Sequence, residues 1–369
     1  MRRIIAQARK ELTQTFRDRL TLALALVLPL VLLALLGTAI SLTVKDIPVV
    51  VQDLDQSPLS RRYVETLQTS LTFRIVSLPV AVQPPEALAA SRARAAIIIP
   101  QHFERDLQRG RDTEVQWLVD ASDANTANII RASSAALTQA FLARLRPAAT
   151  ARPSIRAEMR FRYNPGRESE KYIGAGAFAV LFSLFPPLLS ALAMSREGEQ
   201  KTILQVYTSS ISAHEYLFGK VLGFMVIAAA EWVLMLVLAF ALFGLRFAGD
   251  PVPLLLSTVI YLFCSVSFGV MVGAAIPNQA TAIQATQMGG FLLSFLQSGF
   301  IFPVANIPLG VRWISSLIPA RYYIVVVRDA FFRGGGWDAV WNAPLMLALL
   351  GGVFFAVAWL RMRRMQVEA

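Results

Sequence analysis

Long apolar runs alternate along the chain with one extended polar block. The apolar runs occupy residues 20–44, 172–194, 217–245, 254–276, 285–302 and 341–360. Each run is near the roughly 20 residues that an α-helix needs to cross the hydrocarbon core of a bilayer. The pattern therefore predicts an α-helical polytopic membrane protein with six transmembrane helices.

The polar block at residues 45–171 has a different pattern. Segments with strand spacing and β-branched residues are 47–51, 95–99 and 115–119, and segments with helical spacing are 60–70 and 124–145. Mixed strands and helices in a block of this size predict an α/β domain inserted between the first two spans. Asp53 and Asp55 follow the first strand, where turn chemistry is a better explanation than a cation site.

Basic residues flank both ends of the apolar part. The N-terminal segment 1–19 is amphipathic and basic, and the tail 361–369 opens with three arginines among its first four residues. Since Lys and Arg favour the cytoplasmic side, we expect both termini in the cytoplasm and the α/β domain outside it. A cleaved signal peptide is the alternative for the first run, but its apolar region is usually about 7–15 residues.

The same topology assigns the two longest loops that remain. Segment 195–219 is expected in the cytoplasm, and segment 303–336 outside it. The external segment is amphipathic and rich in Pro, Trp and Tyr. We therefore expect it to be re-entrant or interfacial and not a further span.

Composition and charge exclude several classes of protein. Hydrophobic residues make up 55% and charged residues 16% of the chain, below the roughly 25% charged residues of soluble domains. The net charge of +11 is explained by membrane orientation without a nucleic-acid partner. Cys264 is the single cysteine and the histidines number two, so a disulfide within the chain and structural zinc are excluded.

A phosphate-binding P-loop is absent from the sequence. Gly219-Lys220 lacks both the upstream glycine and the following hydroxyl residue of that motif. We expect no cofactor and no catalytic residue in this chain, so that ATP and Mg would be bound by a separate ATPase subunit.

Polar residues inside the predicted spans are candidates for a translocation path. Glu231 is the one acid deep in an apolar run, and such acids are functional candidates by default. Gln284, Gln287 and Gln297 recur along the fifth span with approximately helical spacing. Hydrogen bonding between helices explains these polar residues about as well, and both interpretations stay open.

Two motifs carry a resemblance to a known family. The first motif lies in the predicted cytoplasmic segment and consists of an Arg-Glu pair, further charges, a threonine and a closing Glu before Gly-Lys. Its residues are Arg196, Glu197, Glu199, Lys201, Thr202, Glu215, Gly219 and Lys220. This segment resembles the region after the second span of ABC-2 type exporter permeases. It departs from the family pattern at Lys201, Leu204 and Ser210, where glycine, an acid and proline are usual.

The second motif lies after the fifth span. It is made of Gly299, Pro303, Pro308, Pro319 and Arg328, and it is similar to the external signature of the same family. The large domain between spans one and two, opening with a β run, Asp-x-Asp and Ser, resembles the drug-efflux branch.

The resemblance implies a membrane subunit of an ATP-driven exporter in a bacterial inner membrane. Expected partners are ABC ATPase subunits, a second permease subunit, membrane lipids and a periplasmic adaptor. The charged cytoplasmic residues would couple to the ATPase as a short amphipathic helix with Ile203 and Val206 as apolar anchors. The exported molecules would be drugs, lipids or other amphipathic molecules. A membrane-anchored receptor or assembly scaffold is the alternative, while a secondary transporter or a membrane enzyme has less support.

Overall fold

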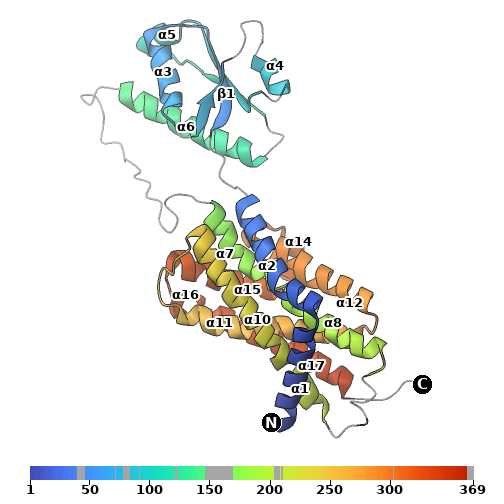
Figure 1. Cartoon of the computed structure of the whole chain (residues 1–369). Coiled ribbons are helices and arrows are strands. Elements are labelled where there is room, and N and C mark those ends of the chain that lie inside the picture. Colours follow the sequence, from blue (N-terminus) through green and yellow to red (C-terminus); the bar gives the residue numbers. More distant parts are fainter. Residues whose placement is uncertain are drawn as a thin grey trace. The chain divides into compact units, whose positions relative to one another are not determined.

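The computed structural model divides the chain into two compact units. One is formed by Met1–Ser41 with Phe161–Ala369, and the other by Leu42–Arg160. Figure 1 shows both units and labels most of their helices and strand β1. The residues that the structure describes are 1–39, 46–70, 72–77, 84–90, 92–120, 124–145, 169–202, 208, 211–301 and 303–363.

The smaller unit is an α/β domain built on a four-stranded sheet. Its elements are β1 (Ile47–Asp53), α3 (Pro58–Gln68), β2 (Phe73–Ile75), α4 (Pro84–Ala89), β3 (Ala95–Ile99), α5 (Phe103–Gln108), β4 (Gln116–Val119) and α6 (Ala124–Leu145). The strand order is β2-β1-β3-β4, with β1 parallel to both neighbours and β3 antiparallel to β4. Three strands and two helices agree with the sequence pattern, whereas β2 was missed because three residues carry no periodicity.

The core of this unit lies between the sheet and helices α3 and α6. Ile47 and Val49 of β1 are buried with Tyr63 of α3 and Phe141 of α6. The rings of Tyr63 and Phe141 meet edge to face with centroids 5.1 Å apart. The alternate residues of a strand point to one face, so the β-branched run of β1 supplies this core directly.

Asp53 and Asp55 are engaged in turn bonding at the end of β1. Asp53 Oδ1 accepts the backbone N–H groups of Asp55 and Gln56, each at 3.0 Å, and its Oδ2 accepts Ser60 Oγ at 2.6 Å. Asp55 Oδ2 accepts the N–H of Glu104 at the start of α5. The structure therefore shows the turn bonding that the sequence predicted at these residues.

The larger unit is a helical bundle with five helices long and apolar enough to span a membrane, counted over the described residues. Their bounds are Arg19–Thr38, Glu170–Glu199, Ala213–Phe243, Val252–Ala275 and Asn342–Met362. They correspond to α2 (Arg19–Ala39), the pair α7 (Ser169–Leu181) and α8 (Phe185–Glu199), α10 (Ala213–Phe243), α11 (Val252–Ala275) and α17 (Asn342–Met362). Five of the predicted spans therefore have a matching helix.

The segment predicted as the fifth span, 285–302, is not a single α-helix. It consists of α12 (Gln279–Thr286), the π-helical turn η2 (Gln287–Leu292) and α13 (Leu293–Gln297). The turn coincides with a glycine pair, and a Cβ on Gly290 would lie 2.5 Å from the carbonyl oxygen of Ser183. Close approach to the α7–α8 junction thus requires glycine, and the wider turn accommodates it.

The junction between α7 and α8 is a break caused by Pro186 and Pro187. Neither proline has an N–H, so the carbonyls four residues earlier, Phe182 and Ser183, lose their helical donors. Ser265 Oγ of α11 donates to the Phe182 carbonyl, and the Tyr261 hydroxyl donates to that of Ala179 at 2.5 Å. Ser265 of α11 therefore satisfies one of the two carbonyls that the prolines expose, and Tyr261 adds a second bond from α11 to the last turn of α7.

Segment 303–336, which the sequence predicts to be external, contains short helices. They are η3 (Val304–Asn306), α14 (Leu309–Ser315), α15 (Pro319–Arg328) and η4 (Asp329–Arg333), followed by α16 (Trp337–Val340). Buried Tyr323 of α15 stacks on Tyr261 of α11 with ring centroids 4.2 Å apart, whereas Trp313 of α14 is 64% exposed. One part of the segment thus lies inside the bundle and another on its surface, which fits a re-entrant and interfacial arrangement.

Candidate ATPase-coupling site

The charged residues of the cytoplasmic motif belong to the ends of two long helices. Arg196, Glu197 and Glu199 lie in the last turns of α8, and Glu215 and Lys220 lie in the first turns of α10. The expectation of a separate amphipathic helix is corrected for Arg196, Glu197 and Glu199, because α8 continues past Ser195 and through Gly198 to Glu199. Ile203 and Val206 lie outside the described residues.

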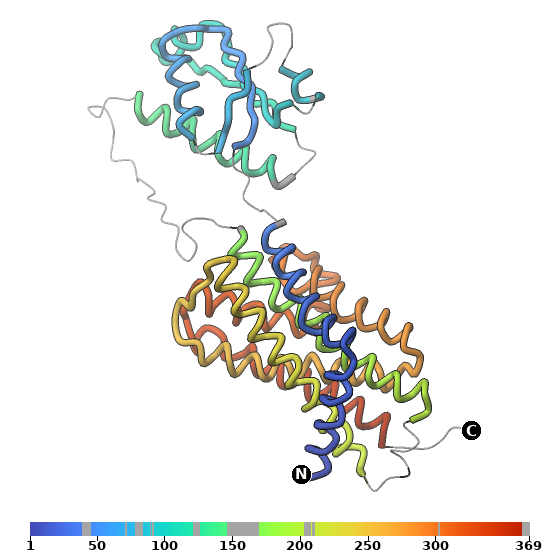
Figure 2. The backbone as a smooth tube through the Cα atoms, in the orientation of Figure 1, coloured from blue at the N-terminus to red at the C-terminus, as the bar shows by residue number. Residues whose placement is uncertain are grey.

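The N-terminal helix α1 (Arg2–Arg17) packs along α10, as Figure 2 shows. A Cβ on Gly219 would lie 2.6 Å from Gln7 Cβ and 2.8 Å from the Ile4 carbonyl oxygen. A Cβ on Gly223 would lie 3.1 Å from the Ala8 carbonyl oxygen. The glycine of the Gly-Lys motif therefore lets the backbone of α1 approach α10 closely.

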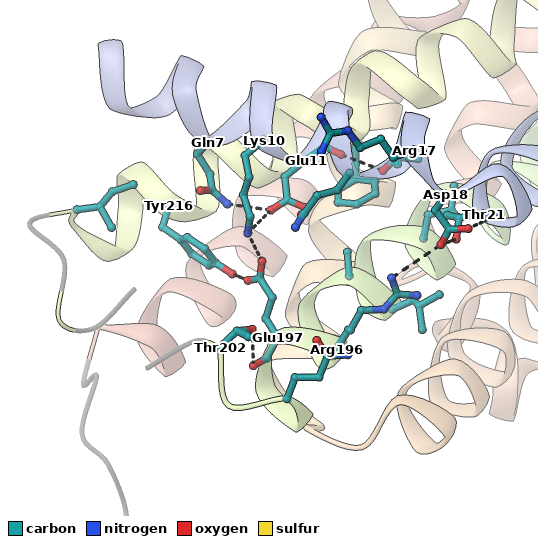
Figure 3. A pocket seen from close by; sticks show the side chains of 18 residues that line it. Gln7, Lys10, Glu11, Arg17, Asp18, Thr21, Arg196, Glu197, Thr202 and Tyr216 are labelled. Carbon is teal, nitrogen blue, oxygen red and sulfur yellow. Dashed lines mark hydrogen bonds and ion pairs between the residues drawn. The ribbon is translucent and has the colours of Figure 1, made fainter. Parts of the chain in front are cut away.

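Four charged side chains from α1, α8 and α10 form one cluster: Lys10, Glu11, Glu197 and Lys220. It is hereafter called the cytoplasmic ion-pair cluster, after the side of the membrane that the sequence predicts for it. Lys220 Nζ lies 2.8 Å from Glu11 Oε1 and 3.3 Å from Glu197 Oε2. Lys10 Nζ donates to Glu197 Oε1 and lies 3.6 Å from Glu11 Oε1 (Figure 3). The Tyr216 hydroxyl donates to Glu197 Oε2. The cluster contains two positive and two negative side chains, so its net charge is zero.

Burial makes this cluster more than a surface ion pair. The side chain of Lys220 is 0% exposed and that of Glu11 is 3% exposed. A buried charge needs both a counter-ion and hydrogen bonds, and Glu11 also accepts from Gln7 Nε2 at 2.8 Å. Glu197 and Lys220 therefore pair with residues of this chain. The sequence-based expectation was that they contact an ATPase.

Two groups of the N-terminal region have shifted pKa values. Burial lowers the pKa of Lys10, but its hydrogen bond and charge interactions with Glu197 and Glu11 outweigh that effect and raise the net pKa. The Thr21 hydroxyl and backbone N–H lower the pKa of Asp18, aided by Arg196. Both groups are consequently held in their charged forms at neutral pH.

Asp18 also separates α1 from α2. Its backbone is extended, with φ −87° and ψ 91°, and its Oδ1 accepts the Thr21 N–H at 3.1 Å as a helix cap. Arg196 Nη1 lies 3.9 Å from Asp18 Oδ2. The Arg-Glu pair of α8 thus contacts the N-terminal region at two places, Arg196 at Asp18 and Glu197 at Lys10.

The other residues of the motif hold the helix ends. Glu215 forms a capping box with Ser212 at the start of α10 and lies 3.6 Å from Arg3. Glu199 accepts hydrogen bonds from the backbone and side-chain nitrogens of Gln279 at the start of α12. Thr202 Oγ1 donates to the Glu197 carbonyl, while Lys201 is exposed.

The external motif is held together by Arg328. Its guanidinium donates to the carbonyls of Gly299 and Phe300 at 2.9 and 3.0 Å and lies 4.1 Å from the ring centroid of Tyr172. Gly299 has φ +87°, a conformation that favours glycine. Pro303, Pro308 and Pro319 each stand at the start of a short helix, where their fixed φ is compatible.

The family model for ABC-2 family transporter proteins matches residues 19–360. The chain belongs to the ABC-2 transporter family. That match runs from the first apolar helix to nearly the end of the last, so it includes both motifs and the inserted α/β domain.

Bacterial permeases are similar to the chain over most of their length. The probable multidrug ABC transporter permease YbhS of Escherichia coli is 25% identical, covering 98% of this chain and 97% of the relative. The inner membrane transport permease YhhJ of the same bacterium is 27% identical over 86% and 85%. ABC transporter G family member 20 of Dictyostelium discoideum is 20% identical over 96% of this chain and 50% of its own length.

The candidate translocation residues of this ABC-2 chain lie in different environments. Glu231 is 0% exposed in α10, and neither carboxylate oxygen has a hydrogen-bond partner among the described residues. Gln284 and Gln287 lie on the exposed face of α12 and η2. Gln297 accepts a hydrogen bond from Ser315 of α14 at 2.9 Å.

Sequence reasoning missed the residues that α1 contributes. Lys10, Glu11 and Asp18 were assigned only to a basic amphipathic segment, although Glu11 and Asp18 are its two acids. Two acids among otherwise basic charged residues are the signal that the sequence offers, because a buried carboxylate needs a partner of opposite charge. Their pairing with residues some 200 positions away was not accessible from local pattern.

Proposed function

We propose that the chain is the membrane-spanning permease subunit of an ATP-driven ABC-2 exporter of amphipathic small molecules, drugs or lipids. Membership of the family implies partnership with ABC ATPase subunits. ATP would be hydrolysed in those subunits, and this chain would carry substrate outward by alternating between two conformations. The observation that carries the proposal is the cytoplasmic ion-pair cluster, which joins three helix ends into one unit on which an ATPase can act.

The cluster supports a lever mechanism. Glu11, Glu197 and Lys220 come from α1, α8 and α10, so displacement of any one helix end breaks a buried ion pair unless the other two follow. Opening such a pair costs several kcal/mol. Motion of a bound ATPase would therefore move the three helices together, as in rigid-body switching.

The contact with the ATPase would use the side chains that point away from the cluster. Glu199 and Lys201 are exposed at the end of α8, and His214 is exposed at the start of α10. Because these residues carry charges of both signs, we expect them to orient the partner more than to strengthen its binding.

Exposed polar residues in α12 and η2 support a dimer. Gln287 lies eight residues after Gln279, about 12 Å along the helix, inside the segment that the sequence predicts as the fifth span. A side-chain amide facing lipid has no hydrogen-bonding solvent, so such residues normally face protein or a water-filled path. A second permease subunit on this face would supply that environment for Gln284 and Gln287.

Substrate class and cellular location follow from the relatives. The printed name of YbhS is a probable multidrug permease and that of YhhJ an inner membrane transport permease. For this chain we accordingly propose an amphipathic cargo and a location in a bacterial inner membrane. Both termini would lie in the cytoplasm, and the chain would cross the membrane six times, with α12, η2 and α13 together forming the fifth span.

The test is recovery of an ABC ATPase with the tagged full-length chain from native membranes in mild detergent. We expect a stoichiometric ATPase with the natural sequence and its loss with the double reversal Glu199→Lys and Lys201→Glu. Asp250→Lys, an equally exposed reversal in the loop between α10 and α11, should retain the ATPase. A stable chain that recovers no ATPase would favour a receptor or scaffold instead. Equal ATPase recovery in all variants would show that Glu199 and Lys201 do not form the contact with the ATPase.

A further inference from the structure

A large cavity lies beside the cytoplasmic ion-pair cluster, between α1, α8 and α10. Its volume is about 840 Å³, within the roughly 300–1,000 Å³ typical of small-molecule sites. Figure 3 shows the side chains of these helices around it. Asp18 and Thr21, where the amphipathic α1 gives way to the apolar α2, belong to its lining, and such a change from amphipathic to apolar helix is expected at the edge of a membrane.

The lining is amphipathic. Its polar residues include Gln14 and Arg17 of α1, Arg196 of α8 and Gln200, which caps α8. Its apolar residues include Leu189, Leu192 and Ala193 of α8 and Phe224 of α10. A ligand that uses both kinds of lining must combine a polar group with an apolar chain.

The charges around the cavity favour an anion. The four members of the ion-pair cluster neutralise one another, which leaves Arg17, Arg196 and Asp18. Asp18 already accepts two hydrogen bonds from Thr21, and its distance to Arg196 is a loose 3.9 Å. Within the described ranges Arg17 has no acidic partner within 4.0 Å, so the two guanidiniums carry one positive charge in excess.

We propose that this cavity binds the phosphate-bearing headgroup of an anionic lipid from the cytoplasmic leaflet. Arg17 and Arg196 hold the phosphate, since guanidinium groups bind phosphate oxygens bidentately. The acyl chains leave along Leu189 and Leu192 toward the bilayer. Basic pockets between helices on the cytoplasmic side recognise headgroups in this way. The proposal does not depend on ATPase coupling, because it concerns binding by the chain alone.

The test is native mass spectrometry of the purified full-length chain titrated with phosphatidylglycerol or phosphatidylethanolamine. We expect retention of one tightly bound phosphatidylglycerol per chain and weaker binding of the zwitterionic lipid. The double variant Arg17→Gln, Arg196→Gln should weaken phosphatidylglycerol binding at least tenfold, as expected for loss of charge-assisted hydrogen bonds. Arg9→Gln, an exposed arginine of α1 outside the lining, should leave binding unchanged.

Three outcomes would overturn the proposal. They are equal binding of both lipids, equal weakening by Arg9→Gln, and unchanged binding in the double variant. A parallel titration with inorganic phosphate separates the sources of the anion, because displacement of the lipid by millimolar phosphate would assign the site to a soluble anion. Thermal unfolding of each variant in the same detergent ensures that lost binding is not lost folding.

Discussion

At the scale of single residues, Lys220 is the centre of the cytoplasmic site. It is fully buried and contacts carboxylates from two other helices, Glu11 and Glu197. The sequence predicted that this lysine matters, from its place in a Gly-Lys pair, but not that its partner is Glu11. A pairing across 209 positions depends on packing that no local pattern encodes.

Replacing Lys220 with Met should destabilise the protein. The variant leaves Glu11 and Glu197 with only Lys10, and breaking a buried ion pair by removing one partner costs roughly 3–5 kcal/mol. The free energy of unfolding, measured by SDS titration in mixed micelles, should fall by about that amount. Lys201→Met removes the same charge from an exposed position and should change it little.

A second variant separates charge imbalance from lost packing. Adding Glu11→Gln to Lys220→Met restores neutrality and leaves the Lys10–Glu197 pair, so it should recover a substantial part of the loss. An additive double variant would show that the two residues do not interact.

Arg328 is the corresponding residue on the external side. Arg328→Lys keeps the charge but cannot donate to the Gly299 and Phe300 carbonyls as a planar fork or stack on Tyr172 in the same way. We expect a loss of roughly 1.5–3 kcal/mol, the range for hydrogen bonds to charged groups. The same unfolding assay with Arg333→Lys, at an exposed position, gives the matched comparison, and equal effects would contradict the assigned role.

At the scale of elements, helix positions were predictable and helix interruptions were less so. Apolar length alone located α2, α10, α11 and α17, because a bilayer imposes that length. The break between α7 and α8 followed from two prolines, whereas the π-helical turn in η2 depends on the contact of Gly290 with Ser183. Such contacts between distant segments are tertiary and are not visible in a sequence window.

The docking of α1 on α10 gives a test at this scale. Gly219→Ala would place a methyl group 2.6 Å from Gln7 Cβ, and overpacking of this kind costs about 1–3 kcal/mol. Protease protection of α1 in detergent should therefore decrease. Gly352→Ala in α17, where the added Cβ meets nothing within 4 Å, should be neutral or slightly stabilising, and similar behaviour of both variants would refute close packing.

At the scale of the whole molecule, an apolar bundle combined with an inserted α/β domain is what the sequence pattern predicted. Because the chain belongs to the ABC-2 family, we interpret this architecture as that of a transport subunit. Charge asymmetry predicted the orientation, but it did not reveal that α1 is part of the cytoplasmic site. That contribution became visible only when α1, α8 and α10 met in one cluster.

The most direct test of the account is ATP-dependent transport by the purified complex of this chain with its ATPase in proteoliposomes. Uptake of a fluorescent amphiphile into the lumen, with the ATPase facing outward, should require ATP hydrolysis and stop with an ATPase variant that binds but does not hydrolyse ATP. Lys220→Met should retain the bound ATPase yet reduce uptake per complex. Uptake that continues without hydrolysis, or an ATP-hydrolysing complex that moves no amphiphile, would contradict the proposed exporter function.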